Sequence, residues 1–182
     1  MKSRIREKMI KEAEAFDLPG YGEIPDIGLF LEQTTKYIGG YTAGLESATL
    51  TGSMISNYVK KKIIANPVKK QYNREQIATL FFIAVAKSVL SLEDIQLLLA
   101  IRRESYDCGT AYDYFRTELK AALLNVFGKE TRMTPLDDKS PESKRLLRNV
   151  IIAAAHKIYL DKYFLAVRQD NEETSQRDES KD

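Results

Sequence analysis

The sequence has very few of the residues that build disulfides and metal sites, with one cysteine, Cys108, and one histidine, His156, among 182 residues. A single cysteine excludes an intrachain disulfide and a multi-cysteine metal site, and it suits a reducing compartment. His156 follows three alanines in an apolar stretch, and no second histidine exists to complete a metal site. We interpret it as a packed or interface residue and expect no metal and no other cofactor.

Recognisable catalytic arrangements are also missing. Cys108 has no histidine nearby in sequence to activate it as a nucleophile. Gly39-Gly40 lacks the lysine and the following helix cap of a phosphate-binding loop. The sequence therefore predicts no catalytic residues and no enzyme. A group of aromatic residues is expected to pack in the core, with a ligand cavity as the alternative; it comprises Tyr106, Tyr112, Tyr114 and Phe115.

No long hydrophobic run is present. The best candidate, Ile77 to Leu90, carries Lys87 and is shorter than the roughly 18 residues that a membrane-spanning helix needs. The N-terminus alternates charges too early to contain the apolar segment of a signal peptide. We therefore expect a cytoplasmic protein with no membrane contact.

The net charge of +2 is small, but its distribution is uneven. Ser47 to Arg74 contains six basic residues and no acidic one, whereas the remaining 22 basic and 26 acidic residues leave the rest of the chain at −4. A positive stripe on an otherwise acidic molecule is typical of a surface that binds an anionic partner. The six residues are Lys60, Lys61, Lys62, Lys69, Lys70 and Arg74.

Apolar residues recur at helical spacing along most of the chain, which predicts an all-α fold. We expect helices over residues 3–16, 26–38, 53–61, from 73 onward, 92–101, 110–127 and 140–167. Their predicted N-caps are Asp26, Thr51, Asn73, Ser91, Thr110 and Ser140. Gly39-Gly40 is expected to end the second helix, and Pro67 to force a turn after the third. A tiny strand pair in a wing after this turn is the only β-structure expected.

The segment most informative about function is 50–99, which reads as a short capped helix, a basic turn and two more capped helices. If Ile55 and Val59 are buried, the opposite face of the short helix points outward. Its Ser and Asn side chains can meet base edges, while lysines neutralise phosphates. The predicted DNA-binding residues are Ser53, Ser56, Asn57, Tyr58, Lys60, Lys61, Lys69, Lys70, Tyr72 and Arg74.

This segment resembles the DNA-binding half of MerR-type transcriptional regulators. The resemblance rests on Thr51 as a cap, Tyr58 as an aromatic, the exit Ile63-Ile64, the basic turn closing on Tyr72, and the run 91–95, Ser-Leu-Glu-Asp-Ile. The runs 24–26 and 53–60 are more closely similar to an uncharacterised family of Gram-positive bacterial proteins with a MerR-like domain. That similarity covers most of residues 18–165 and implies a winged helix-turn-helix.

Three positions depart from the MerR pattern. Ser56 stands where those proteins place an arginine, and Lys62 stands at their exit glycine. Lys62 would be strained if the position requires a positive φ. The wing, 66–71, is also short. Beyond residue 102 the resemblance to MerR proteins ends, so their effector and dimer geometry does not carry over.

The sequence therefore predicts a DNA-binding transcriptional regulator with four parts. Residues 1–23 form an N-terminal helix and connector, 24–102 the MerR-like helix-turn-helix, 110–167 a helical hairpin for dimerisation or signal input, and 168–182 a disordered tail. The expected partners are double-stranded DNA, a second copy in a homodimer, and an unknown effector if there is one. The alternative is a helical protein–protein interaction module that keeps this scaffold without binding DNA.

Overall fold

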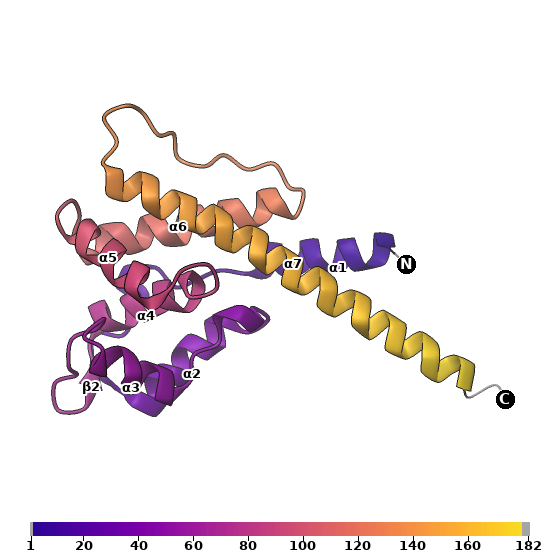
Figure 1. Ribbon diagram of the computed structural model, residues 1–182, viewed down its shortest axis with the longest axis horizontal. Helices are drawn as coiled ribbons and strands as arrows, with labels where there is room; N and C mark the ends of the chain where they lie inside the picture. Colours follow the sequence, from indigo (N-terminus) through magenta and orange to yellow (C-terminus); the bar gives the residue numbers. More distant parts are fainter. Residues whose placement is uncertain (1, 180–182) are drawn as a thin grey trace.

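The structure is a computed structural model that describes residues 2–179. Within this range it has seven α-helices and one two-stranded sheet, which confirms the all-α prediction with a minimal β-wing (Figure 1). The helices are α1 (Lys2–Ala15), α2 (Leu31–Thr42), α3 (Gly52–Lys60), α4 (Arg74–Ala86), α5 (Leu92–Arg103), α6 (Cys108–Val126) and α7 (Glu142–Glu179). The strands are β1 (Leu29–Phe30) and β2 (Gln71–Tyr72), and two short 3₁₀ turns are η1 (Tyr21–Glu23) and η2 (Glu46–Ala48).

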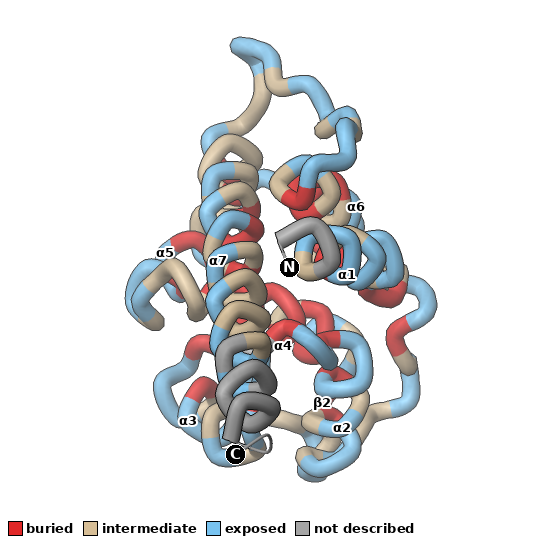
Figure 2. The backbone as a smooth tube through the Cα atoms, turned by 90° about the vertical axis from the view of Figure 1, so that its right-hand side faces the viewer, coloured by how far each residue is buried: buried red, intermediate tan, exposed pale blue. Residues whose placement is uncertain are grey.

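Helix α4 lies at the centre of the molecule because its sequence is apolar on almost every side. Ten of its residues are buried, including every residue from Leu80 to Ala86. A helix that is hydrophobic all round must be covered all round, and α2, α6, α7 and η2 all pack against it. Buried residues gather at this junction in Figure 2. The buried apolar side chains from α1 to α7 form one continuous cluster.

The ends of the helices near the basic segment are fixed by caps that the sequence predicted. Thr51 accepts from the Met54 amide at the start of α3, and Ser91 accepts from the Asp94 amide at the start of α5. Asn73 and Gln76 form a reciprocal capping box at the start of α4. The same Gln76 side chain donates to the Ala65 carbonyl at 2.8 Å. The segment between α3 and α4 is therefore tied to the core.

The second helix differs from its prediction at both ends. Residues 29–30 are extended because β1 pairs antiparallel with β2, with Leu29 opposite Tyr72. Helix α2 therefore starts at Leu31, and its N-cap is Phe30 rather than Asp26. Gly39-Gly40 does not end it. The buried Ile38 and Thr42 lie one helical turn apart, so continuing the helix buries both side chains.

The two C-terminal helices begin at different residues from those predicted. Asp107, not Thr110, caps α6, so Cys108 is the first helical residue rather than part of a loop. The Ser140 hydroxyl bonds to Asp137 instead of capping α7, and the Pro141 carbonyl accepts the first amide bonds of that helix. The predicted disordered tail starts at 168, whereas α7 continues to Glu179 and projects beyond the other helices (Figure 1). Residues 180–182 lie outside the described range.

A buried ion pair joins α6 to α7 and to the connection between them. The Glu118 side chain is 1% exposed, and its Oε2 accepts from the Arg148 guanidinium at 2.8 Å. The other oxygen accepts from the Thr134 amide at 2.8 Å. Arg148 also donates to the Thr134 carbonyl. One carboxylate thus holds the α6–α7 connection against both helices.

We predict that Glu118→Ala lowers the free energy of unfolding by about 3 kcal/mol, because it leaves a largely buried guanidinium without its partner. Urea denaturation followed by circular dichroism measures the change. Glu130→Ala, on the exposed part of the same connection, is the control and should shift stability by less than about 0.5 kcal/mol. Equal losses in the two variants would contradict the role of the buried pair.

Candidate nucleic-acid interface

Helix α3 lies at an edge of the molecule (Figure 2), and the residues that it exposes to solvent are polar. Ser53, Ser56, Asn57 and Lys60 are exposed and follow the i, i+3, i+4, i+7 spacing of a single helix face. On the opposite side Ile55 is fully buried. The later helices of the chain leave this face uncovered, so an external partner has access to it.

The polar side chains of this face differ in how far they are already bonded. The Ser56 hydroxyl donates to the Gly52 carbonyl at 2.8 Å, and the Ser53 hydroxyl lies 2.9 Å from that of Thr51. The side-chain amide of Asn57 makes no hydrogen bond to another described residue. Asn57 is therefore the side chain of α3 with its donors and acceptor fully available to a ligand.

Five lysines lie between the last turn of this helix and the start of β2, and we call them the lysine cluster. Lys60, Lys61, Lys62, Lys69 and Lys70 are all exposed. Lys61 lies 3.8 Å from Glu93 of α5, both of them well exposed, and such surface pairs contribute little stability. Among the described residues the other four form no ion pair. The charge of this cluster remains largely uncompensated.

Three of these lysines adopt a backbone conformation that favours glycine. Lys62, Lys69 and Lys70 have φ values of 56°, 50° and 65°, and they are the non-glycine residues with positive φ in the described part of the chain. Lys69 and Lys70 are the central residues of a tight turn closed by the Gln71 amide and the Val68 carbonyl at 2.9 Å. Positive φ at both positions matches a type I′ turn, where Asn-Gly is usual. The strain foreseen for Lys62 is therefore present, and it recurs twice.

Three predicted contact residues have structural positions instead. Tyr58 and Tyr72 are only 2% and 4% exposed, and burial raises the pKa of both phenols. Arg74 donates to the Ile24 carbonyl at 2.8 Å and lies 3.9 Å from the Asp26 carboxylate. These side chains hold the ends of α3, β2 and α4 in place, and we do not propose them as contacts to DNA.

An apolar group borders the basic turn, and the sequence reasoning missed it. Ile27, Phe30 and Val68 are 77%, 49% and 73% exposed. Phe30 and Val68 lie near each other because both pair with Gln71, and Ile27 lies two residues before β1. Only the strand register brings Phe30 and Val68 side by side. The candidate interface thus combines a polar helix face, a lysine cluster and an apolar edge.

Three features find no support in the described residues: a metal site, a membrane-spanning helix and a nucleophilic cysteine. No group of three or more His, Cys, Asp or Glu side chains is arranged to hold a metal ion. Within the same range, no helix combines the length and the apolar character needed to cross a bilayer. Burial raises the pKa of the Cys108 thiol, which disfavours the thiolate that a nucleophile requires.

The geometry defines an all-helical protein in which an exposed short helix is followed by a lysine-rich connection that leads into a two-stranded sheet. The chain belongs to the family described as Domain of unknown function (DUF1836), whose model matches residues 19–115. The matched segment contains α2, α3, both strands, α4 and α5 and ends within α6. No curated protein and no solved structure matches the chain.

We predict that Lys62→Gly raises the free energy of unfolding by about 1 kcal/mol, because glycine removes the steric cost of a left-handed residue. Urea denaturation measures the change. The matched control is Lys60→Gly, which removes the same side chain from a helical position and should lower stability by about 0.5–1 kcal/mol. Destabilisation by both substitutions would show that the Lys62 backbone is not strained.

Proposed function

We propose that this protein binds double-stranded DNA through the exposed face of α3 and acts as a transcriptional regulator. The observation that carries the proposal is that Asn57 of α3 and five lysines are all exposed within a segment, 47–74, that has no acidic residue. A helix of this width fits the major groove, where an asparagine amide can pair with adenine. The lysines then neutralise flanking phosphates.

The arrangement of neighbouring elements supports this function. A strand before α2 pairs with a strand after the basic turn, and this order of elements supports the proposal of a winged helix-turn-helix. The resemblance to MerR-type regulators indicates the same layout. The connection 43–51 between α2 and α3 is longer than the usual turn of this motif. Its 3₁₀ turn η2 packs on α4 and α7, which keeps the connection on the protein side.

The strained lysines add a second argument. A left-handed residue other than glycine costs about 1–2 kcal/mol, and this cost recurs at three lysines in one loop system. Backbone strain of this kind collects at functional positions. A requirement for positive charge at these points explains why lysine stands where glycine or asparagine is conformationally easier.

We further propose that the regulator acts as a homodimer, because one short recognition helix gives modest affinity and two-fold operators are read by paired helices. Helix α7 offers a surface for pairing, since Leu160 and Phe164 are 47% and 51% exposed one turn apart. His156 is exposed one turn before Leu160. The histidine would then be an interface residue rather than a core one.

The first test removes charge from the face. We predict that the double substitution Lys60→Ala and Lys61→Ala weakens binding to any duplex sequence at least tenfold and reduces the salt dependence by about one to two counterions. Fluorescence anisotropy with a random-sequence duplex at several salt concentrations measures both. The matched control is Lys8→Ala with Lys11→Ala, two exposed lysines on α1. Unchanged affinity in the α3 variant would refute the proposal.

The second test addresses base reading. Asn57→Ala should leave the salt dependence intact, because it removes no charge, and it should lower the preference for a selected site by about 1–3 kcal/mol. Selection of bound fragments from a genomic library with the unaltered chain supplies that site. Thr117→Ala, at an exposed polar residue of α6 outside the proposed interface, is the control and should leave the preference unchanged. An unchanged preference in the Asn57 variant would show that α3 does not read bases there.

The exposed Ile27, Phe30 and Val68 favour a second candidate, a protein-interaction module on the same scaffold. Contiguous apolar side chains with a polar rim are typical of protein interfaces. Retention on duplex DNA, eluted with a salt gradient, separates the two functions. Elution below physiological salt would favour the interaction module.

A further inference from the structure

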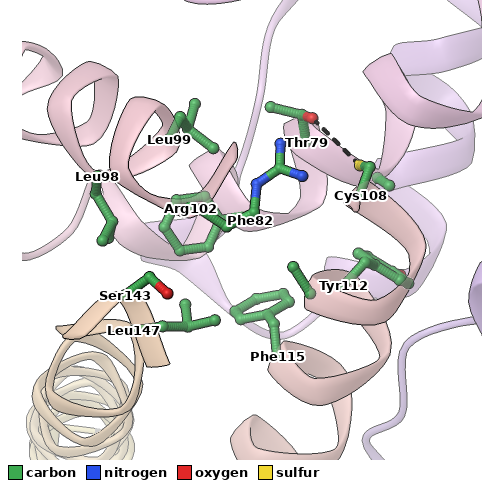
Figure 3. Close-up of a pocket in the computed structure, with 12 residues that line it drawn as sticks. Thr79, Phe82, Leu98, Leu99, Arg102, Cys108, Tyr112, Phe115, Ser143 and Leu147 are labelled. Atoms are coloured by element: carbon green, nitrogen blue, oxygen red, sulfur yellow. Dashed lines mark hydrogen bonds between the residues drawn. The ribbon is translucent and has the colours of Figure 1, made fainter. Parts of the chain in front are cut away.

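Two adjoining cavities lie between α4, α5, α6 and α7, and Figure 3 shows the smaller of them. Their volumes are about 40 and 130 Å³, and both are lined by Arg102, Ala111, Ser143 and Leu147. The aromatic residues that the sequence singled out are brought together in their walls, which include Tyr106, Tyr112, Tyr114 and Phe115. These residues therefore pack in the core and also line a cavity.

The lining is positively charged and contains no Asp or Glu. Arg102 ends α5 and donates to the Tyr106 carbonyl at 3.2 Å, while the Lys144 ammonium lies 5.1 Å from the centre of the Tyr114 ring. Neither cation forms an ion pair with a described residue. Two unpaired cations beside apolar walls favour an anionic ligand with an apolar body.

The Ser143 hydroxyl supplies an independent observation. The residue is only 3% exposed, and its Oγ has no hydrogen-bond partner. Ser143 and Leu147 on α7 face Phe115 on α6 across the cavity (Figure 3). A buried hydroxyl without a partner costs about 1–3 kcal/mol. A ligand oxygen that accepts a hydrogen bond from the Ser143 hydroxyl would remove this cost. The N-terminus of α7, where Ser143 lies, also favours a negative charge.

We propose that these cavities bind a small organic anion with an apolar body. The apolar body packs against Phe115 and Leu147, Arg102 and Lys144 hold the carboxylate, and the Ser143 hydroxyl donates to one of its oxygens. A cavity of about 150 Å³ accommodates benzene, and the two adjoining cavities of about 40 and 130 Å³ together offer a similar volume, so the site suits a monocarboxylate of benzoate size. This proposal does not depend on DNA binding.

Isothermal titration calorimetry of the full chain with benzoate, hexanoate and neutral benzamide tests the site. We expect saturable binding of at least one carboxylate with a Kd of about 1 mM or tighter, and at least tenfold weaker binding of benzamide. Arg102→Gln should weaken carboxylate binding at least tenfold. Arg103→Gln, the matched control with the same charge change on the exposed side of α5, should leave it unchanged.

Two further variants distinguish a ligand contact from a structural role. Ser143→Ala should weaken carboxylate binding several-fold without lowering thermal stability, because the hydroxyl has no partner to lose. Ala111→Leu should abolish binding by filling both cavities. Cys108 lines the smaller cavity and is the only cysteine in the sequence. In the unaltered protein, a bound benzoate should therefore slow the reaction of Cys108 with a thiol reagent. Equal affinity for benzoate and benzamide, or no heat and no protection with either carboxylate, would overturn the proposal.

Discussion

The burial of α4 on all sides is the constraint on which the rest of the structure depends. A helix with Leu80 to Ala86 buried without interruption cannot face water along those two turns. It therefore forces α2 to cover one side and α6 and α7 to cover the others. The N-terminal end of the same helix is fixed by the Asn73–Gln76 capping box, directly after β2. A single apolar helix thus sets the positions of α3, the basic turn and the C-terminal hairpin together.

The parts of the fold that sequence predicted are those fixed by local chemistry. Thr51, Asn73 and Ser91 cap the helices assigned to them, because a side-chain oxygen near free amides acts within one turn. The predictions were wrong where contacts between residues far apart in the sequence determine the structure. Strand pairing with β2 delays the start of α2, and tertiary burial of Ile38 and Thr42 carries the helix past Gly39-Gly40. Helical spacing was enough to predict that Asn57 and Lys60 point outward. Only the packing shows that Tyr58 and Tyr72 are buried and that Arg74 bonds to the Ile24 carbonyl.

Conformational cost and charge compete in the basic segment. Glycine or asparagine would relieve Lys62, Lys69 and Lys70, and the gain of about 1 kcal/mol at each is a large share of the 5–15 kcal/mol by which domains are stable. The ion pair between Lys61 and Glu93 cannot balance that cost, since exposed pairs contribute at most about 1 kcal/mol. No contact inside the described protein offsets it. The DNA partner proposed above would offset it, because each phosphate contact releases a counterion.

Helix α5 borders both proposed sites, with Glu93 in its first turn next to Lys61 and Arg102 in its last turn lining the cavities. A ligand in the cavities influences α3 only if its affinity differs between two arrangements of the helices. The exposed Lys61–Glu93 pair is too weak to transmit such a difference. Both α5 and α4 contribute cavity walls, through Leu98 and Phe82, and α4 starts next to the basic turn. Any coupling between the two sites therefore depends on the close packing of α4, which resists small displacements, and not on the ion pair at the surface.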